Sequence, residues 1–216
     1  MNFYIGSLTI IIMGFGSKVF TEETTLTEHL SMNGSVTSRD NLAVPSIKVN
    51  GSVTIRGNLD VYEGSLSVNG AIDISGDLII TDDSKINGVC DVRGSIFSSF
   101  LKVNGPLNAE SMDGTEFWLS SQVNVKTDIV ASEAIVFNVG KDHKFIIGGI
   151  IEAPEVTFKK KLSFNPLKKL AGLLSISKRE VSEILITDVN IKAEKLFLRG
   201  VELEGDIDVG EVIYLE

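Results

Sequence analysis

The four residues Lys48-Val49-Asn50-Gly51 follow a pattern, x-Φ-Asn-Gly with Φ apolar, that occurs five times in the sequence. The glycines of the five copies fall at positions 34, 51, 70, 88 and 105, so that the steps between them are 17, 19, 18 and 17 residues. A period near 18 is too short for a two-helix repeat and is typical of one coil of a solenoid. The other copies are Ser31-Met32-Asn33-Gly34, Ser67-Val68-Asn69-Gly70, Lys85-Ile86-Asn87-Gly88 and Lys102-Val103-Asn104-Gly105.

Each period contains shorter units that begin at a glycine and carry apolar residues two and four positions later. Gly51 is followed by Val53 and Ile55, and Gly64 is followed by Leu66 and Val68. Alternation over three residues predicts a very short strand, which suits one side of a triangular coil of roughly 18 residues. The inward positions predicted in this way are Val53, Ile55, Leu59, Val61, Leu66, Val68, Ile72, Ile74, Leu78 and Ile80, with Thr54, Asp60, Ser67 and Asp73 facing water.

Asn-Gly pairs also form type I′ turns in β-hairpins. Hairpins would need longer flanking strands, and they would leave the additional glycines at 57, 64, 76 and 94 unexplained. The repeat alignment sets Gly88-Val89-Cys90 against Gly70-Ala71-Ile72. It therefore predicts that Cys90 is a buried core residue rather than a reactive thiol.

The repeat frame continues beyond residue 105 with fewer glycines. Leu107 and Ala109 take inward positions, and a Φ-x-Ala sequence pattern recurs in residues 128–137, 150–158 and 191–198. We therefore predict an all-β chain in which residues 26–216 form a single-stranded β-helix of about nine coils. Residues 166–182 break the frame with leucines at helical spacing and a capping-box pattern, which predicts a short, partly helical insertion.

Residues 1–25 form an apolar N-terminal segment, and residues 1–16 carry no charged side chain. The apolar stretch is shorter than a membrane-spanning helix requires and lacks the basic residues that precede a signal-peptide core. Thr9–Met13 could form a capping strand at the end of the stack. Alternatively, a membrane surface could be contacted through Phe3, Tyr4, Ile5, Leu8, Ile10, Ile11 and Ile12.

The composition limits the functions that the chain could serve. The net charge is −9, which argues against general nucleic-acid binding. The single cysteine fits a reducing compartment, so a cytoplasmic location is expected. Residues 141–180 hold nine Lys or Arg and four acids, which is either a solvated basic face or a patch for anionic lipid or an acidic neighbour. The chain beyond Gly200 is strongly acidic.

No pattern in the sequence points to catalysis, a cofactor, a nucleotide or a metal. His29 and His143 lack a Ser or Cys partner in any recognisable motif. Asp82-Asp83 lacks the Gly and Asp spacing of calcium-binding β-rolls, and Gly14-Phe15-Gly16 has neither the third glycine nor the lysine of a phosphate loop. We therefore predict a non-enzymatic protein with no catalytic, cofactor-binding or metal-binding residues.

At the level of its repeats the chain resembles the bactofilins, a polymer-forming cytoskeletal family. The resemblance rests on the recurring glycines from Gly34 to Gly105, which are expected at the corners of the coils, and on the sequence pattern of residues 191–200. It implies a right-handed β-helix and nucleotide-independent filaments without polarity in the cytoplasm, often at the inner face of the membrane through a short N-terminal segment. The insertion and the number of coils depart from the family pattern.

The expected partner is therefore the protein itself. A β-helix ends in a coil whose backbone groups are unpaired over an apolar cross-section, so either a cap or another molecule must cover it. The sequence predicts strand up to Val212, Ile213, Tyr214 and Leu215, and we expect these residues to form the self-assembly interface. The alternatives are a β-helical binding or assembly module that does not polymerise, such as a cell-division regulator or adhesin-like protein, and an enzyme built on a β-helix.

Overall fold

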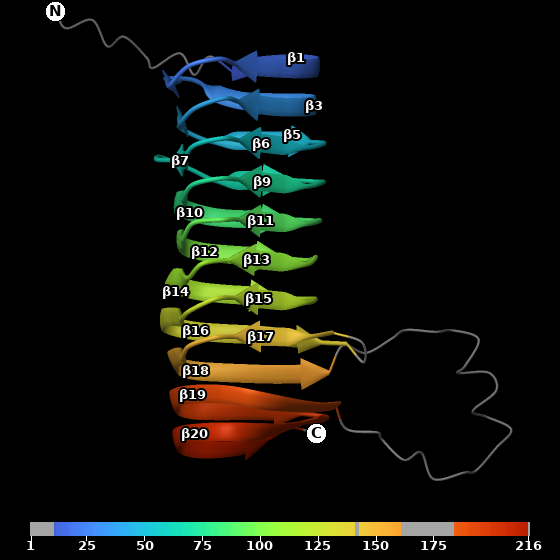
Figure 1. Ribbon diagram of the computed structural model, residues 1–216, viewed down its shortest axis with the longest axis vertical. Coiled ribbons are helices and arrows are strands. Elements are labelled where there is room, and N and C mark those ends of the chain that lie inside the picture. The colour runs from blue at the N-terminus through green and yellow to red at the C-terminus, as the bar shows by residue number, and fades with distance from the viewer. Residues whose placement is uncertain (1–10, 141–142, 161–183, 216) are drawn as a thin grey trace, which may run out of the picture.

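The protein is a β-solenoid of about ten turns in which all strands run parallel to their neighbours (Figure 1). The computed structural model describes residues 11–140, 143–160 and 184–215, and no helix occurs among them. The predicted all-β coil with a repeat of roughly 18 residues is confirmed. The strands are β1 (Ile11–Phe20), β2 (Thr24–Thr25), β3 (His29–Ser38), β4 (Leu42–Val44), β5 (Ile47–Asn50), β6 (Val53–Ile55), β7 (Leu59–Val61), β8 (Leu66–Val68), β9 (Ile72–Ile74), β10 (Leu78–Ile86), β11 (Cys90–Val92), β12 (Ile96–Val103), β13 (Leu107–Ala109), β14 (Met112–Leu119), β15 (Val123–Val125), β16 (Ile129–Val139), β17 (Phe145–Ile147), β18 (Ile151–Lys160), β19 (Ile184–Arg199) and β20 (Val201–Tyr214).

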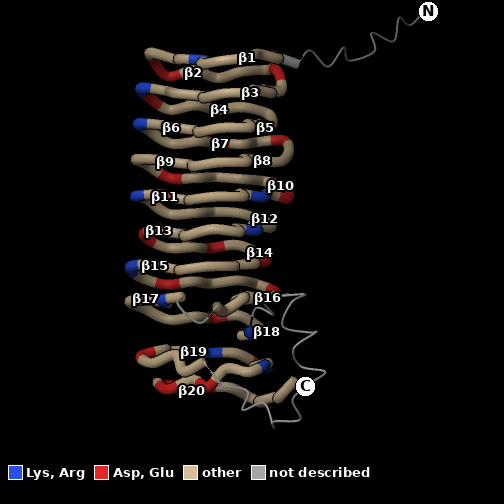
Figure 2. Tube along the Cα trace, turned by 90° about the vertical axis from the view of Figure 1, so that its right-hand side faces the viewer, with Lys and Arg blue, Asp and Glu red and all other residues tan. Residues whose placement is uncertain are grey.

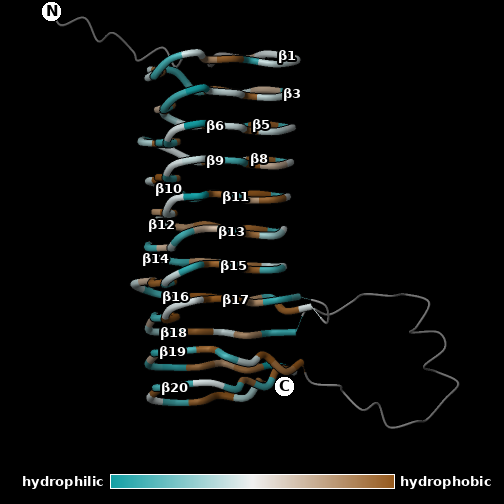
Figure 3. Tube along the Cα trace, in the orientation of Figure 1, coloured by the Kyte–Doolittle hydropathy of each residue, from teal (hydrophilic) through white to brown (hydrophobic). Residues whose placement is uncertain are grey.

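The turn formed by β6, β7 and β8 shows the three-sided plan most clearly. Each of these strands is three residues long, and each pairs with the equivalent strand one turn later. Val53 lies against Ile72, and Val68 against Ile86, so that inward residues form continuous columns through the rod. The predicted inward residues of this region are all buried, and hydrophobic and hydrophilic positions alternate along the turns (Figure 3).

A column of glycines lies at one corner because the backbones of successive turns approach closely there. At Gly51, which has φ +153°, a Cβ atom would lie 1.9 Å from the carbonyl oxygen of Gly34. At Gly88 the same atom would lie 2.1 Å from the carbonyl oxygen of Gly70. No side chain fits at this spacing, which explains why glycine recurs once per turn.

The asparagines that precede these glycines form a hydrogen-bonded ladder on the surface. The amide nitrogen of Asn50 donates to the side-chain oxygen of Asn33 at 2.7 Å, and Asn69 donates in the same way to Asn50 at 2.8 Å. Asn87 donates to Asn69 at 2.6 Å, and Asn104 to Asn87 at 2.7 Å. The repeated x-Φ-Asn-Gly pattern therefore encodes both a steric requirement of the backbone and a polar contact between turns.

The solenoid begins earlier than the predicted boundary at residue 26. β1 covers Ile11–Met13 of the expected capping strand, continues to Phe20, and pairs along its whole length with β3. The repeat is hard to detect here because Lys18 occupies the inward position of Val36, and Thr24 that of Leu42. The predicted insertion at 166–182 lies outside the described residues.

Candidate assembly surfaces at the two ends of the solenoid

At the C-terminal end, the last turn leaves one face of the coil uncovered among the described residues. β20 pairs with β19, and no described strand pairs with its other edge. Val212 and Tyr214 occupy inward columns, yet their exposed fractions are 41% and 77%, whereas Val68 in the column of Tyr214 is fully buried. The columns that form the core elsewhere are thus open to solvent here.

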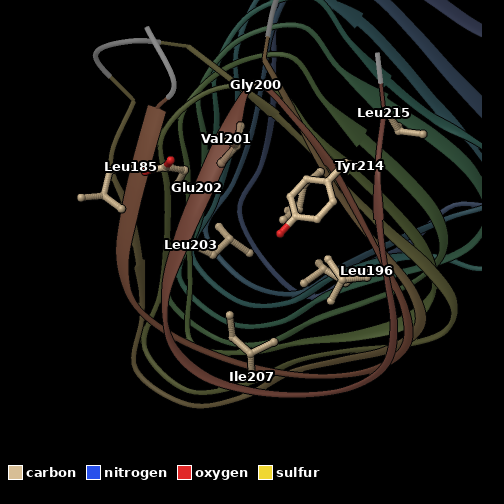
Figure 4. Close-up of a pocket in the computed structure, with 11 residues that line it drawn as sticks. Leu185, Leu196, Gly200, Val201, Glu202, Leu203, Ile207, Tyr214 and Leu215 are labelled. Atoms are coloured by element: carbon tan, nitrogen blue, oxygen red, sulfur yellow. The ribbon is translucent and has the colours of Figure 1, made fainter.

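These open columns enclose a hollow of about 480 Å³. Its lining includes Leu196, Val201, Leu203 and Ile207, and Figure 4 shows the ring of Tyr214 inside the outline of the last coil. Leu215, by contrast, points away from the coil axis. The hollow is therefore the apolar cross-section of the rod rather than a cleft on its side.

At the N-terminal end, β1 likewise pairs only with β3 among the described strands. Met13 and Phe15 are 77% and 88% exposed. Gly14 lies between them in an inward column, next to Met32. Lys18 also occupies an inward column, with its ammonium 5.5 Å from the centre of the Phe20 ring. This end is thus apolar in part, with one cation at its rim.

The two ends differ in charge. β20 contains five acidic residues and no Lys or Arg (Figure 2). All five acids are exposed. β1 contains Lys18 and no acidic residue, although Glu22 and Glu23 follow it closely. The C-terminal end therefore repels a second copy of itself more strongly than it repels the N-terminal end. The five acids of β20 are Glu202, Glu204, Asp206, Asp208 and Glu211.

The flanks of the rod hold the titratable groups that the sequence singled out, and the structure keeps them apart. The nitrogen Nδ1 of His29 lies 2.5 Å from the hydroxyl of Ser46, and Nδ1 of His143 accepts a hydrogen bond from the backbone N–H of Gly140 at 2.8 Å. Cys90 is buried in the column of Ile72, as predicted, and burial raises the pKa of its thiol to about 12. A buried thiol of this kind is a poor nucleophile.

Asp82 and Asp83 lie exposed within β10, where the side chain of Asp82 accepts a hydrogen bond from the backbone N–H of Asp83. In the described ranges, no group of three or more His, Cys, Asp or Glu is arranged to hold a metal ion. The same ranges contain no helix that is long and apolar enough to span a bilayer.

One cluster on the flank was not anticipated. Trp118 points outward from β14, and the ammonium groups of Lys102 and Lys159 each lie 5.0 Å from the centre of its ring system. The indole N–H of Trp118 donates to the carboxylate of Glu116 at 2.5 Å. The centres of the Phe100 and Trp118 rings lie 6.3 Å apart. The spacing of these residues in the sequence carries no motif, because they meet only through the stacking of turns.

Some predicted surfaces cannot be placed. Of the expected membrane-contact residues, Phe3, Tyr4, Ile5, Leu8 and Ile10 lie outside the described residues, and Ile11 and Ile12 begin β1. Much of the basic region at 141–180 also lies outside them. The predicted self-assembly residues Val212, Ile213, Tyr214 and Leu215 lie together at the C-terminal end, in β20 and directly after it.

No protein-family model, curated protein or solved structure matches this chain. The fold defines it as a parallel β-solenoid, and its first and last strands, β1 and β20, each pair on one edge only among the described strands.

Proposed function

We propose that this protein is a non-enzymatic structural subunit that self-assembles end to end into filaments without nucleotide. The observation that supports this proposal most strongly is the pair of edges at β1 and β20 that have no partner among the described strands. The edge of β20 lies over an apolar cross-section, and the edge of β1 over a partly apolar one. Unpaired strand edges are templates for pairing with another chain. In the middle turns, where each strand pairs on both edges, the flanks of the rod offer no such template.

The energetics fit a concentration-dependent association. Full burial of a large apolar side chain contributes about 1.5–3 kcal/mol, so covering the exposed parts of Met13, Phe15, Val212 and Tyr214 would contribute roughly 4–8 kcal/mol. Loss of translational and rotational freedom opposes association by about 4–15 kcal/mol. Backbone hydrogen bonds along the new strand pair add to the favourable side. Assembly should therefore appear above a threshold concentration rather than at any dilution.

The resemblance of the repeats to bactofilins supports the same function, with a cytoplasmic scaffold as the cellular role. A membrane contact through the N-terminal segment belongs to this proposal, and liposome pelleting of the chain with and without residues 1–10 tests it. Pelleting that does not depend on residues 1–10 would contradict the contact.

A second function is supported by Lys18. Charged residues that point inward at a sheet edge are one of the means by which natural sheets block edge-to-edge pairing. A binding module that stays monomeric would use such a residue at β1 and present its flank, including the Trp118 cluster, to a partner. This alternative predicts short single rods at all concentrations.

Sedimentation with negative-stain microscopy, without nucleotide, separates the two functions. The proposal predicts filaments of the wild type and at least a tenfold higher threshold concentration for Phe15→Ser, because the serine removes apolar area from the end. Phe97→Ser is the matched control, since Phe97 is also exposed but lies on the flank in β12. Equal loss of assembly in both variants, or uniform single rods of the wild type, would contradict the proposal.

A further inference from the structure

We propose that the subunits stack head to tail, so that residues 213–215 of one copy lie over residues 13–15 of the next. This inference rests on the proposed self-assembly and adds its polarity and its contact. It differs from what the resemblance implies, because bactofilin filaments are expected to lack polarity.

The first column is the inward one that ends at Gly14 and Tyr214. Strand pairing in register links its members without a break, and every member between the two ends is buried and apolar. A copy stacked in continued register would place the Tyr214 ring over Gly14, where there is no side chain to obstruct it. The members in order are Gly14, Met32, Val49, Val68, Ile86, Val103, Leu119, Phe137, Phe158, Leu198 and Tyr214.

The base of this position is itself suited to an aromatic ring. The sulfur of Met32 lies 2.8 Å from where a Cβ of residue 14 would be, so the thioether fills the space beneath the Gly14 backbone. Sulfur–aromatic contacts are favourable and are common in apolar interiors. The most exposed inward residue of the last turn thus has a matching position at the other end.

The outward columns on either side give an independent observation. Met13 pairs in register with Ser31, and Phe15 with Asn33, so both lie in columns whose next members are polar. At the other end the flanking residues are again apolar, namely Ile213 and Leu215. The column of Phe15 and Leu215 is polar from Asn33 to Arg199, as the asparagine ladder shows. The column of Met13 and Ile213 is polar from Ser31 to Lys102, and further on it also contains the apolar residues Trp118, Val136 and Phe197.

Phe15 and Leu215, the apolar ends of an otherwise polar column, are explained if they meet across a contact, in which Met13 and Ile213 lie beside them. Stacked strands lie roughly 4.8 Å apart, which would bring each pair into van der Waals contact. A solenoid that stays single gains nothing from a phenylalanine that is 88% exposed at this position.

Strand direction and charge favour unlike ends. Every pairing between neighbouring strands of the rod is parallel, and a head-to-tail stack continues that arrangement from β20 to β1. Two C-terminal ends would instead place the five acids of one β20 beside the five of another, and like charges on adjacent strands are destabilising. Two N-terminal ends would bring together Phe15 and Lys18 of both copies without any Tyr214 ring.

Disulfide cross-linking between the two stacked strands tests the polarity. Met13 and Ile213 are the end members of one outward column, at opposite ends of the rod. Head-to-tail stacking would bring their Cα atoms to roughly 4.8 Å, within the range that a disulfide spans. The variants Met13→Cys and Ile213→Cys are made in the full chain, with a tag on one so that mixed dimers differ in size from homodimers. Wild-type protein, in which Cys90 is buried, is the control for background cross-linking.

Oxidation of the mixed variants should give the mixed dimer, and each variant alone should give none. Filaments with a homodimer of either variant, or filaments without the mixed dimer, would contradict the head-to-tail contact while leaving self-assembly intact. If the protein formed no filaments and gave no cross-link at high concentration, the proposed function itself would be contradicted. As a second measure, Tyr214→Ser should raise the threshold concentration at least tenfold, because it removes the ring that would cover Gly14, whereas Tyr214→Phe should leave the threshold within about twofold of the wild type.

Discussion

The turns between Asn33 and Asn104 and the last turn of the solenoid share one frame of inward positions but place them in opposite environments. In the middle turns the inward residues are buried from both sides, and the outward corner carries the asparagine ladder. In β20 the same columns are covered from one side only, so that Tyr214 is largely exposed. The asparagine ladder does not extend to this strand, which carries five acidic residues instead.

This difference shows what a repeat does for its neighbours. A single coil is too thin to bury its own columns, so each turn is stabilised by the turns above and below it. The middle turns have both neighbours, whereas β1 and β20 have one each among the described strands. Substitutions at equivalent positions should therefore affect folding in the middle and association at the ends.

The largest expected effect is that of Gly51→Ala. Its Cβ would meet the Gly34 carbonyl oxygen, and its φ is unfavourable for alanine, so we expect a loss of about 3 kcal/mol or more in the free energy of unfolding. Gly16→Ala is the control for the backbone conformation alone, because Gly16 has φ +90° and nothing within 4 Å. It should lose about 1–2 kcal/mol. Equal losses in denaturant unfolding would show that close stacking does not explain the glycine column.

A matched pair of valines sharpens the comparison. Val53 is buried in the middle and Val212 is half-exposed at the end. Val53→Ala should lower the free energy of unfolding by about 2–3 kcal/mol, because it removes buried methyl groups and leaves a cavity. Val212→Ala should cost less than about 1 kcal/mol in the unassembled protein. If Val212→Ala proved as destabilising as Val53→Ala, the last turn would be covered in solution.

Exclusion of water from the core of the middle turns can be measured through the pH dependence of stability that Cys90 causes. Because burial raises the pKa of this thiol from 9.0 to about 12, the folded protein favours the neutral thiol. The stabilisation is complete below pH 9 and is lost as pH rises towards 12. Between pH 7 and pH 10 the free energy of unfolding of the wild type should therefore fall by about 1.4 kcal/mol more than that of Cys90→Val. A pH-independent difference would indicate that water reaches this column.

The smallest effect is expected in the asparagine ladder. Asn69 takes part in two side-chain hydrogen bonds, and Asn33 in one. Because the ladder is exposed, Asn69→Ala should cost about 1 kcal/mol and Asn33→Ala about half of that. Thermal unfolding of the two variants provides the measurement. If both variants unfolded at the same midpoint temperature as the wild type, the ladder would contribute nothing to stability.

Much of the fold could be predicted from the sequence because the middle turns repeat a local rule. Three-residue alternation between glycines specifies the sides, and the alignment placed Cys90 correctly in the column of Ile72. The first turn was missed because Lys18 and Thr24 occupy inward positions at an open end, where burial no longer requires apolar residues.

The candidate surfaces were harder to predict, since they depend on register across the whole chain. The exposure of Val212 and Tyr214 follows from their place in the last turn, which the sequence indicated. The match between residues 13–15 and 213–215 needs ten strand registers in succession, and no local motif records it. The Trp118 cluster is a similar case, because Lys102, Trp118 and Lys159 come from three different turns.

Cryo-electron microscopy of the assembled wild-type chain tests the central claim most directly. Eleven strands lie in the column from Gly14 to Tyr214, so a continued stack at roughly 4.8 Å per strand should give filaments one subunit wide with an axial repeat of roughly 53 Å, formed without nucleotide. Single rods of that length at every concentration, with no axial association, would contradict the claim that the ends of the solenoid join copies of the chain.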